Sequence, residues 1–390
     1  MLKKFLQQSS TKYIAMKQIY YFLHQNGSTT KANLVEQLKM KQTTVNRHLE
    51  QLLKDQIIQI GQYEASSGGR PPSLFEVNPE AGFIIGIDLS RTKTTLTLVN
   101  SKFDDVDHYS FMMTEQHTPA HTISILAKQI KHLLDKHQIS SDMVLGIGIG
   151  TVGPIDRIEG MILEPDAFIA EGWHHIPLVK ELKEKVNIDT IRIENGANLA
   201  ALMSGHNCRD TILYCISGRG LRCGVVSNGS MIHNKTGDAS SFGEMILDLH
   251  YGTSLASLIS YDYLLKDVNR RYQEQHSRKF LDFENKKDAM DQLLTALQQG
   301  DAIVQEAVSD SAFMYGIGIA NMVNVLHPDK VVLNSELTIH YQPYYQKIVE
   351  TAKQHIKRIE REPVSFTMEQ QRDQIISLGA CALVFQGYFS

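Results

Sequence analysis

The feature that most constrains the fold is a strand–turn–strand pattern that occurs in two distant parts of the chain. In the first copy, an apolar run over 82–89 is followed by a turn and a second run over 94–99. The second copy covers 211–217 and 222–227, and Asn228-Gly229 after it is a hairpin signal. Short apolar runs bounded by turn residues are typical of buried strands, so both copies predict antiparallel hairpins within a sheet.

Each hairpin is followed by segments that complete an α/β half. The pattern predicts further strands at 109–113, 144–150, 190–193, 330–333 and 364–367, and helices at 122–137, 302–325, 341–357 and 374–386. Two such halves indicate a duplicated α/β domain of the ribonuclease H-like or actin-like type, in two lobes, over residues 81–390. We expect one lobe to hold 81–200 with the C-terminal helix 375–390, and the other to hold 201–374. The apolar helix 302–325 is a core or subunit-interface helix.

Residues 1–80 have a different pattern, of three short amphipathic helices and then a hairpin. Asn26-Gly27 ends the first helix, Thr29 or Thr30 caps the second, and the third covers 42–55. Strands at 57–60 and 74–77 flank a small-residue tip over 64–72, which predicts an α+β winged helix-turn-helix. The candidate DNA-binding residues are the polar start of the third helix and the wing tip: Gln42, Thr43, Thr44, Asn46, Arg47, Gly68, Gly69 and Arg70.

The charge distribution agrees with a head that meets a polyanion. Residues 1–80 hold 10 lysines and arginines against 6 acidic residues, whereas the remainder holds 29 against 37. The alternative is a three-helix protein-interaction module with a solvated hairpin. We favour DNA binding because the basic charge, the polar helix start and the arginine in the wing occur together.

Composition excludes several other classes of protein. No run approaches the roughly 18 apolar residues that span a bilayer, and the N-terminus lacks the apolar core of a signal peptide. The four cysteines show no CxxC spacing, which argues against a zinc site and suits free thiols in a reducing cytoplasm.

The stretch 189–201 offers the main candidate for a small-molecule site. A short strand runs into Glu194-Asn195-Gly196 and then an Ala/Leu-rich helix. Polar side chains at the carboxyl end of a strand lie where open α/β sheets place ligands. The alternative is that these residues only make the turn, with Asn195 or Gly196 capping the helix.

Taken together, the motifs resemble the ROK family of repressors and sugar kinases, in its repressor form of the xylose-repressor type. The resemblance covers nearly the whole chain, and its order and spacing make it specific. It is carried by the winged helix-turn-helix and by Ser67-Gly-Gly-Arg-Pro-Pro72, Ile85-Gly-Ile-Asp-Leu89, Gly146-Ile-Gly-Ile-Gly150, Gly153-Pro-Ile-Asp156, Gly172-Trp173, Ile193-Glu-Asn-Gly-Ala-Asn198 and Ser241-Phe-Gly-Glu244. The resemblance implies binding to operator DNA as a homodimer or homotetramer, and a sugar or sugar-phosphate effector held partly by Glu194, Asn195 and Glu244.

Departures from the family pattern argue against catalysis. Family kinases carry Glu-Asn-Asp, whose Asp is the general base, where this chain has Gly196. Losing a positioned base typically forfeits about 10²–10⁴ in rate. The glycine-rich nucleotide hairpins are interrupted by residues such as Arg91, Arg219 and Arg222, and the family's cysteine-rich zinc motif is absent after Glu244. We therefore expect no ATP, no zinc and no enzymatic activity.

Two other functions stay open at this point. One is an active ATP-dependent sugar kinase, and the other is a ligand-independent DNA-binding scaffold controlled by a protein partner. Arg219 and Arg222 also leave two interpretations, because they either form internal salt bridges or bind an anion such as a phosphorylated sugar.

Overall fold

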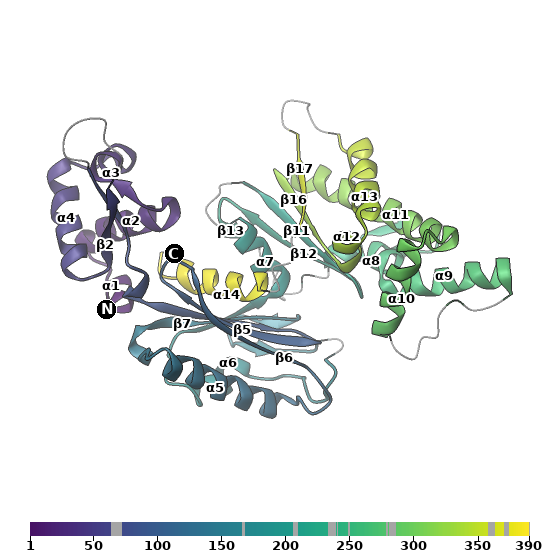
Figure 1. Ribbon diagram of the computed structural model, residues 1–390, viewed down its shortest axis with the longest axis horizontal. Coiled ribbons are helices and arrows are strands. Elements are labelled where there is room, and N and C mark those ends of the chain that lie inside the picture. The colour runs from purple at the N-terminus through teal and green to yellow at the C-terminus, as the bar shows by residue number, and fades with distance from the viewer. Residues whose placement is uncertain are drawn as a thin grey trace. The chain divides into compact units, whose positions relative to one another are not determined.

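The chain forms two compact units, which are described separately. The computed structural model describes residues 1–63, 72–165, 168–205, 210–232, 239, 241–248, 250–277, 280, 286–357, 363–369 and 374–389. One unit comprises Met1–Leu199 with Gln374–Ser390, and the other comprises Ala200–Asp373 (Figure 1). Each unit is built on a five-stranded sheet.

The head at the start of the first unit is a winged helix-turn-helix. It comprises α1 (Leu2–Leu6), α2 (Thr11–Asn26), β1 (Thr29–Thr30), α3 (Lys31–Leu38), α4 (Gln42–Lys54), β2 (Ile58–Tyr63) and β3 (Ser73–Val77). The strands form a small sheet in the order β1-β3-β2. As the sequence predicts, Thr30 caps α3, and its hydroxyl accepts a hydrogen bond from the Asn33 N–H at 3.3 Å. The short elements α1 and β1 were not predicted.

The sheet of the first unit combines a hairpin with parallel strands. Its order is β10 (Ile191–Asn195), β7 (Val144–Thr151), β4 (Phe83–Leu89), β5 (Lys93–Asn100) and β6 (Asp105–Met112). The strands β10, β7 and β4 are parallel, and β4, β5 and β6 are antiparallel. The β4 side chains that face α5 alternate with those that face α14, so these helices cover opposite faces of the sheet (Figure 1).

The remaining elements of the first unit lie around this sheet. They are η1 (Pro79–Ala81), α5 (Pro119–Lys136), η2 (Ser141–Met143), β8 (Ile155–Asp156), β9 (Met161–Ile162), α6 (Leu178–Lys183) and α14 (Ile375–Gln386), while α7 (Gly196–Ser204) crosses into the second unit. The strands β8 and β9 pair as a separate hairpin.

The second unit repeats the same sheet topology. Its order is β13 (Ser230–Met231), β12 (Leu221–Ser227), β11 (Ile212–Ser217), β16 (Lys330–Asn334) and β17 (Ser365–Met368). Again a hairpin is extended by two parallel strands. The duplication predicted from the two strand–turn–strand patterns is therefore present.

Helices form most of the rest of the second unit. They are η3 (Ser241–Glu244), α8 (Leu255–Ile259), α9 (Tyr261–His276), α10 (Lys286–Gln298), α11 (Ala302–Leu326), α12 (Glu336–His340) and α13 (Gln342–His355), beside the small sheet of β14 (Ile246–Asp248) and β15 (Thr253–Ser254). The predicted apolar helix is α11, and Tyr315 and Ile319 at its centre are fully buried. It is a core helix of this unit.

Candidate nucleic-acid interface and effector site

The start of α4 presents polar side chains on a rigid support. Gln42, Thr43 and Arg47 are exposed, and Thr44 and Asn46 are half-buried. The opposite side of the helix packs into the core of the head through Val45, Leu49 and Leu52, each at most 1% exposed. The helical period separates these two faces. Gln42, Thr43 and Arg47 therefore lie on its outer face, and Thr44 and Asn46 lie at its edge, where the side-chain oxygen of Asn46 is buried.

His48 lies beneath the exposed face of α4 and is only 2% exposed. Burial, together with the neighbouring charges of Arg47 and Lys12, lowers the pKa of His48 from its usual value. A neutral imidazole is thus built into the packed side of the helix. Sequence reasoning did not single out this residue, since the periodicity alone does not show which polar side chain is buried.

The wing strands are those predicted, and β2 pairs with β3 from Ile58 opposite Val77 to Tyr63 opposite Ser73. The three wing-tip candidates, Gly68, Gly69 and Arg70, lie outside the described residues. Their role in DNA binding stays a prediction.

In the second candidate site, Glu194 is occupied by an internal ion pair. Its side chain is 1% exposed, and Arg157 meets it with Nε at 2.6 Å from Oε2 and Nη2 at 3.0 Å from Oε1. The carboxylate also accepts hydrogen bonds from the Asn195 N–H at 2.7 Å and the Asn198 amide at 3.0 Å. Such a two-point contact is the strong form of an Arg–carboxylate pair. Arg157 follows β8, and no pattern in the sequence pointed to it.

Asn195 is 2% exposed, and its side-chain oxygen accepts a hydrogen bond from the Ala197 N–H at 2.9 Å. This is the capping role that the sequence left open as an alternative to a cleft residue. The structure thus brings Glu194 and Asn195 together at the end of β10. Glu244 belongs to the other unit, where it ends η3 and is exposed.

In the second unit, three polar side chains from β11, the end of β16 and the residue after β17 form a chain of hydrogen bonds. The Asn334 amide donates to the Tyr214 hydroxyl at 3.0 Å, and that hydroxyl lies 3.1 Å from Glu369 Oε2. Ser335 then caps α12 in a reciprocal arrangement with Thr338. Asn334 and Ser335 at the end of β16 therefore have a local structural use.

The turn that follows β14 is held by hydrogen bonds from its own backbone to Asp248. Asp248 Oδ1 accepts hydrogen bonds from the N–H groups of His250 at 2.9 Å and Tyr251 at 3.3 Å. Across the described part of the chain, no group of three or more His, Cys, Asp or Glu side chains is arranged to hold a metal ion.

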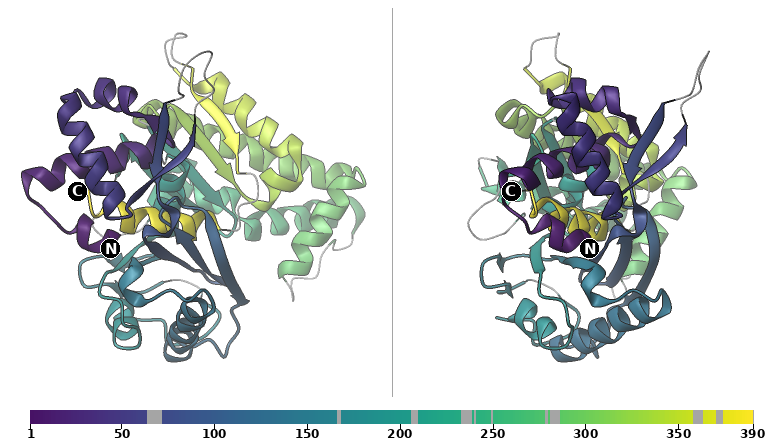
Figure 2. Two further views of the ribbon diagram at one scale, coloured as in Figure 1. Left: turned by 60° about the vertical axis from the view of Figure 1, so that its left-hand side comes forward. Right: turned by 90° about the vertical axis from the view of Figure 1, so that its left-hand side faces the viewer.

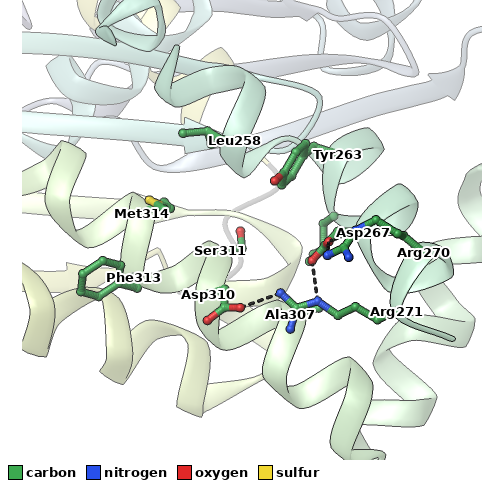
Figure 3. A pocket seen from close by; sticks show the side chains of 11 residues that line it. Leu258, Tyr263, Asp267, Arg270, Arg271, Ala307, Asp310, Ser311, Phe313 and Met314 are labelled. Atoms are coloured by element: carbon green, nitrogen blue, oxygen red, sulfur yellow. Dashed lines mark hydrogen bonds and ion pairs between the residues drawn. The ribbon is translucent and has the colours of Figure 1, made fainter. Parts of the chain in front are cut away.

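A cavity of about 220 Å³ lies between α8, α9 and α11 in the second unit (Figure 3). Tyr263, Phe313 and Met314 contribute its apolar surface. Its polar wall is Arg271, whose guanidinium contacts Asp267 at 2.8 Å and Asp310 at 2.6 Å. Arg270, which also lines the cavity, contacts Asp267 at 2.6 Å, so two arginines and two aspartates leave the lining without net charge.

Both the head and the rest of the chain match models of known protein families. Residues 84–386 match the model of the ROK family, and residues 16–59 match a model described as winged helix-turn-helix DNA-binding. The chain belongs to the ROK family.

Two named relatives and one solved structure illustrate what this chain is similar to. A xylose repressor of Caldicellulosiruptor bescii is 22% identical over 378 residues, covering 94% of each chain. A glucokinase of Halalkalibacterium halodurans is 24% identical over 265 residues, which is 64% of this chain and 78% of the enzyme. A solved ROK transcriptional regulator, a homologue of the E. coli MLC protein, superimposes with a TM-score of 0.77 at 16% identity, over 97% of this chain and 96% of that one.

These matches confirm the family and the fold predicted from the sequence. The repressor relatives match the head and the ROK domain together, whereas the glucokinase match covers a smaller share of this chain. Among the described residues, no helix is long and apolar enough to cross a membrane.

Proposed function

We propose that this ROK protein is a DNA-binding transcriptional repressor of carbohydrate-utilisation genes, and that its kinase-like domain senses a sugar or sugar phosphate. The observation that carries the proposal is the polar, exposed start of α4 on a basic winged head, joined to a ROK domain. The xylose repressor that matches over 94% of this chain supports a sugar-responsive role. A pentose such as xylose is the first effector to test.

The DNA complex that we propose has two heads on one operator. A homodimer would place α4 of each subunit in successive major grooves, about one helical turn apart. Gln42, Thr43 and Asn46 would read base edges, and Arg47 would contact a base or phosphate. The wing, with Arg70, would add a contact to the backbone or minor groove.

We further propose that the domain binds its effector without phosphorylating it, and works without ATP or zinc. Gly196 stands where family kinases have the general base, and glycine has no group to accept a proton. Glu194 already has four polar contacts within the protein, which suits a structural carboxylate. We propose Asn195 and Glu244, together with Glu194, for effector binding.

The DNA-binding proposal is tested with duplexes that the full-length protein selects from a randomised pool. Arg47→Ala should weaken binding by about 1–3 kcal/mol and relax sequence preference. Lys131→Ala removes an exposed charge from α5 in the body and should leave affinity unchanged. Fluorescence anisotropy at several salt concentrations measures both. Equal affinities for Arg47→Ala and the parent would rule out α4 as the reading helix.

The sensing proposal is tested by repeating the DNA titration with a panel of sugars and sugar phosphates, D-xylose included. One member should change the affinity for DNA, while a coupled assay detects no ATP consumption with any sugar. Robust ATP consumption with any sugar would instead support an active sugar kinase, a function for which the similar glucokinase is the model. DNA binding that no small molecule changes would support a scaffold controlled by a protein partner.

A further inference from the structure

Helix α14 reaches the Asn195–Gly196 turn with its first residues. A Cβ atom added at Gly196 would lie 3.2 Å from Ile376 Cδ1, and one added at Gly150 would overlap Ile376 Cγ2. Ile376 therefore fills the space beside the carboxyl ends of β7 and β10. The turn therefore has little room to shift toward α14 without displacing this side chain.

The middle of α14 is seated directly on the sheet. A Cβ at Gly86 would overlap the Ser377 carbonyl oxygen, and a Cβ at Gly148 would overlap that of Ala380. The Ser377 and Thr97 hydroxyls are 2.7 Å apart, and both residues are fully buried. At Gly86 and Gly148 no strand side chain separates the sheet from the α14 backbone, so the helix has little freedom to deform there and we expect it to move as one body.

The last turn of α14 packs against the head. Phe385 is 1% exposed, and its ring stacks on that of His24 in α2 with 4.1 Å between centroids. The Phe103 ring meets the Phe385 ring edge-on, with 5.6 Å between their centroids. After the helix, Phe389 lies 4.8 Å from the Tyr21 ring. Figures 1 and 2 show α14, in yellow, lying on its sheet beside the purple head.

The helix that receives these contacts is part of the DNA-binding unit. The buried faces of α2 and α4 share one hydrophobic cluster, in which Tyr20 and Leu49 lie together with Phe385 and Val384 of α14. A change in the position of Phe385 therefore acts on the support of the reading helix. The 12 residues of α14 span about 18 Å at 1.5 Å per residue, so the helix joins the surroundings of Ile376 to those of Phe385 over about that distance.

We infer that α14 couples the Asn195–Gly196 turn to the DNA-binding head, with Ile376 and Phe385 as the positioning residues at its two ends. The inference rests on the proposed function, because it names how an effector at that turn controls DNA binding. If the coupling exists, a displacement of Ile376 changes the stability or the position of α2. This change can be measured without DNA or sugar.

The experiment is hydrogen–deuterium exchange on the full-length chain with a graded series at one glycine. Gly196→Ala and Gly196→Val push progressively on Ile376. Gly220→Val is the matched control, because a Cβ at Gly220 meets nothing within 4 Å. We expect exchange in α2 to rise on the order of fivefold in Gly196→Val, less in Gly196→Ala, and not at all in the control. Adding Ile376→Ala should restore slow exchange, because the group that is pushed has been removed.

Two results would overturn the inference. In one, exchange changes in the first turn of α14 but α2 behaves as in the control. In the other, the effect on α2 persists when Ile376→Ala is added. If Gly196→Val loosens the whole unit, the comparison is made with Gly196→Ala. A chain that binds neither DNA nor sugar would refute the proposed function, yet it would leave this readout of coupling intact.

Discussion

Replacing Arg157 by methionine is the sharpest test of the site at the end of β10. The substitution keeps a long side chain but removes the cation that faces Glu194, whose carboxylate is 1% exposed. Breaking a buried ion pair on one side typically costs 3–5 kcal/mol, since a charge is left in the interior without its partner. Here two hydrogen bonds to the carboxylate remain, and the Arg157 side chain is 20% exposed, so water can reach the vacated space.

These features place the expected loss at the lower end, about 3 kcal/mol. For a unit of residues 1–199 with 374–390, that loss lowers the melting temperature by roughly 6–12 °C. Adding Glu194→Gln removes the stranded charge, so the double variant should recover at least about 1.5 kcal/mol of the loss. Urea and thermal unfolding of the full-length chain measure both effects.

The control is Lys183→Met, which removes an exposed charge from α6 and should stay within about 0.5 kcal/mol of the parent. If Arg157→Met is as stable as this control, the ion pair with Glu194 does not stabilise the protein. If Glu194→Gln brings no recovery, the loss of stability in Arg157→Met comes from something other than an unpaired carboxylate.

Three further variants test other parts of the structure. The pKa of His48 is lowered by burial, so the unfolded chain takes up a proton first, near pH 6.5. Stability should be full above that pH and fall as the pH drops toward the folded value, and His48→Gln should flatten this dependence in melts between pH 5 and 8. Gly148→Ala places a methyl group against the α14 backbone and should cost about 1–3 kcal/mol or more, whereas Gly220→Ala, in open space, should stay within about 0.5 kcal/mol in the same unfolding assay. Tyr214→Phe removes a buried hydroxyl with two polar partners and should cost about 1–3 kcal/mol in urea unfolding, and an unchanged midpoint would contradict the assigned hydrogen bonds.

The elements of the fold were largely predictable because their signals are local. Apolar runs bounded by turns marked β4, β5 and β7, and helical spacing marked α2 and α4. Among the missed elements are α1, of five residues, and β1, of two. Both are too short to show a period, and β1 exists only because β3 offers it a partner.

The site was predictable only in part. Sequence by itself determined that Glu194-Asn195-Gly196 ends a strand and starts a helix, and that no base stands at Gly196. It did not show that Arg157, 37 residues earlier, pairs with Glu194, because that contact depends on how the β8–β9 hairpin folds back. An ion pair between distant residues has no periodic signature in the chain.

The glycines of Gly146-Ile-Gly-Ile-Gly150 show the same difference between what the sequence predicts and what the tertiary structure decides. The sequence identified them as a family motif on a buried strand, but their physical role lies far away in the chain. They leave room for α14, whose carbonyl and aliphatic groups occupy the space that side chains would take. Only the tertiary structure decided this, because close packing between a strand and a helix from the opposite end of the chain is a property of the assembled unit. The same packing brings Ile376 to the turn and Phe385 to the head.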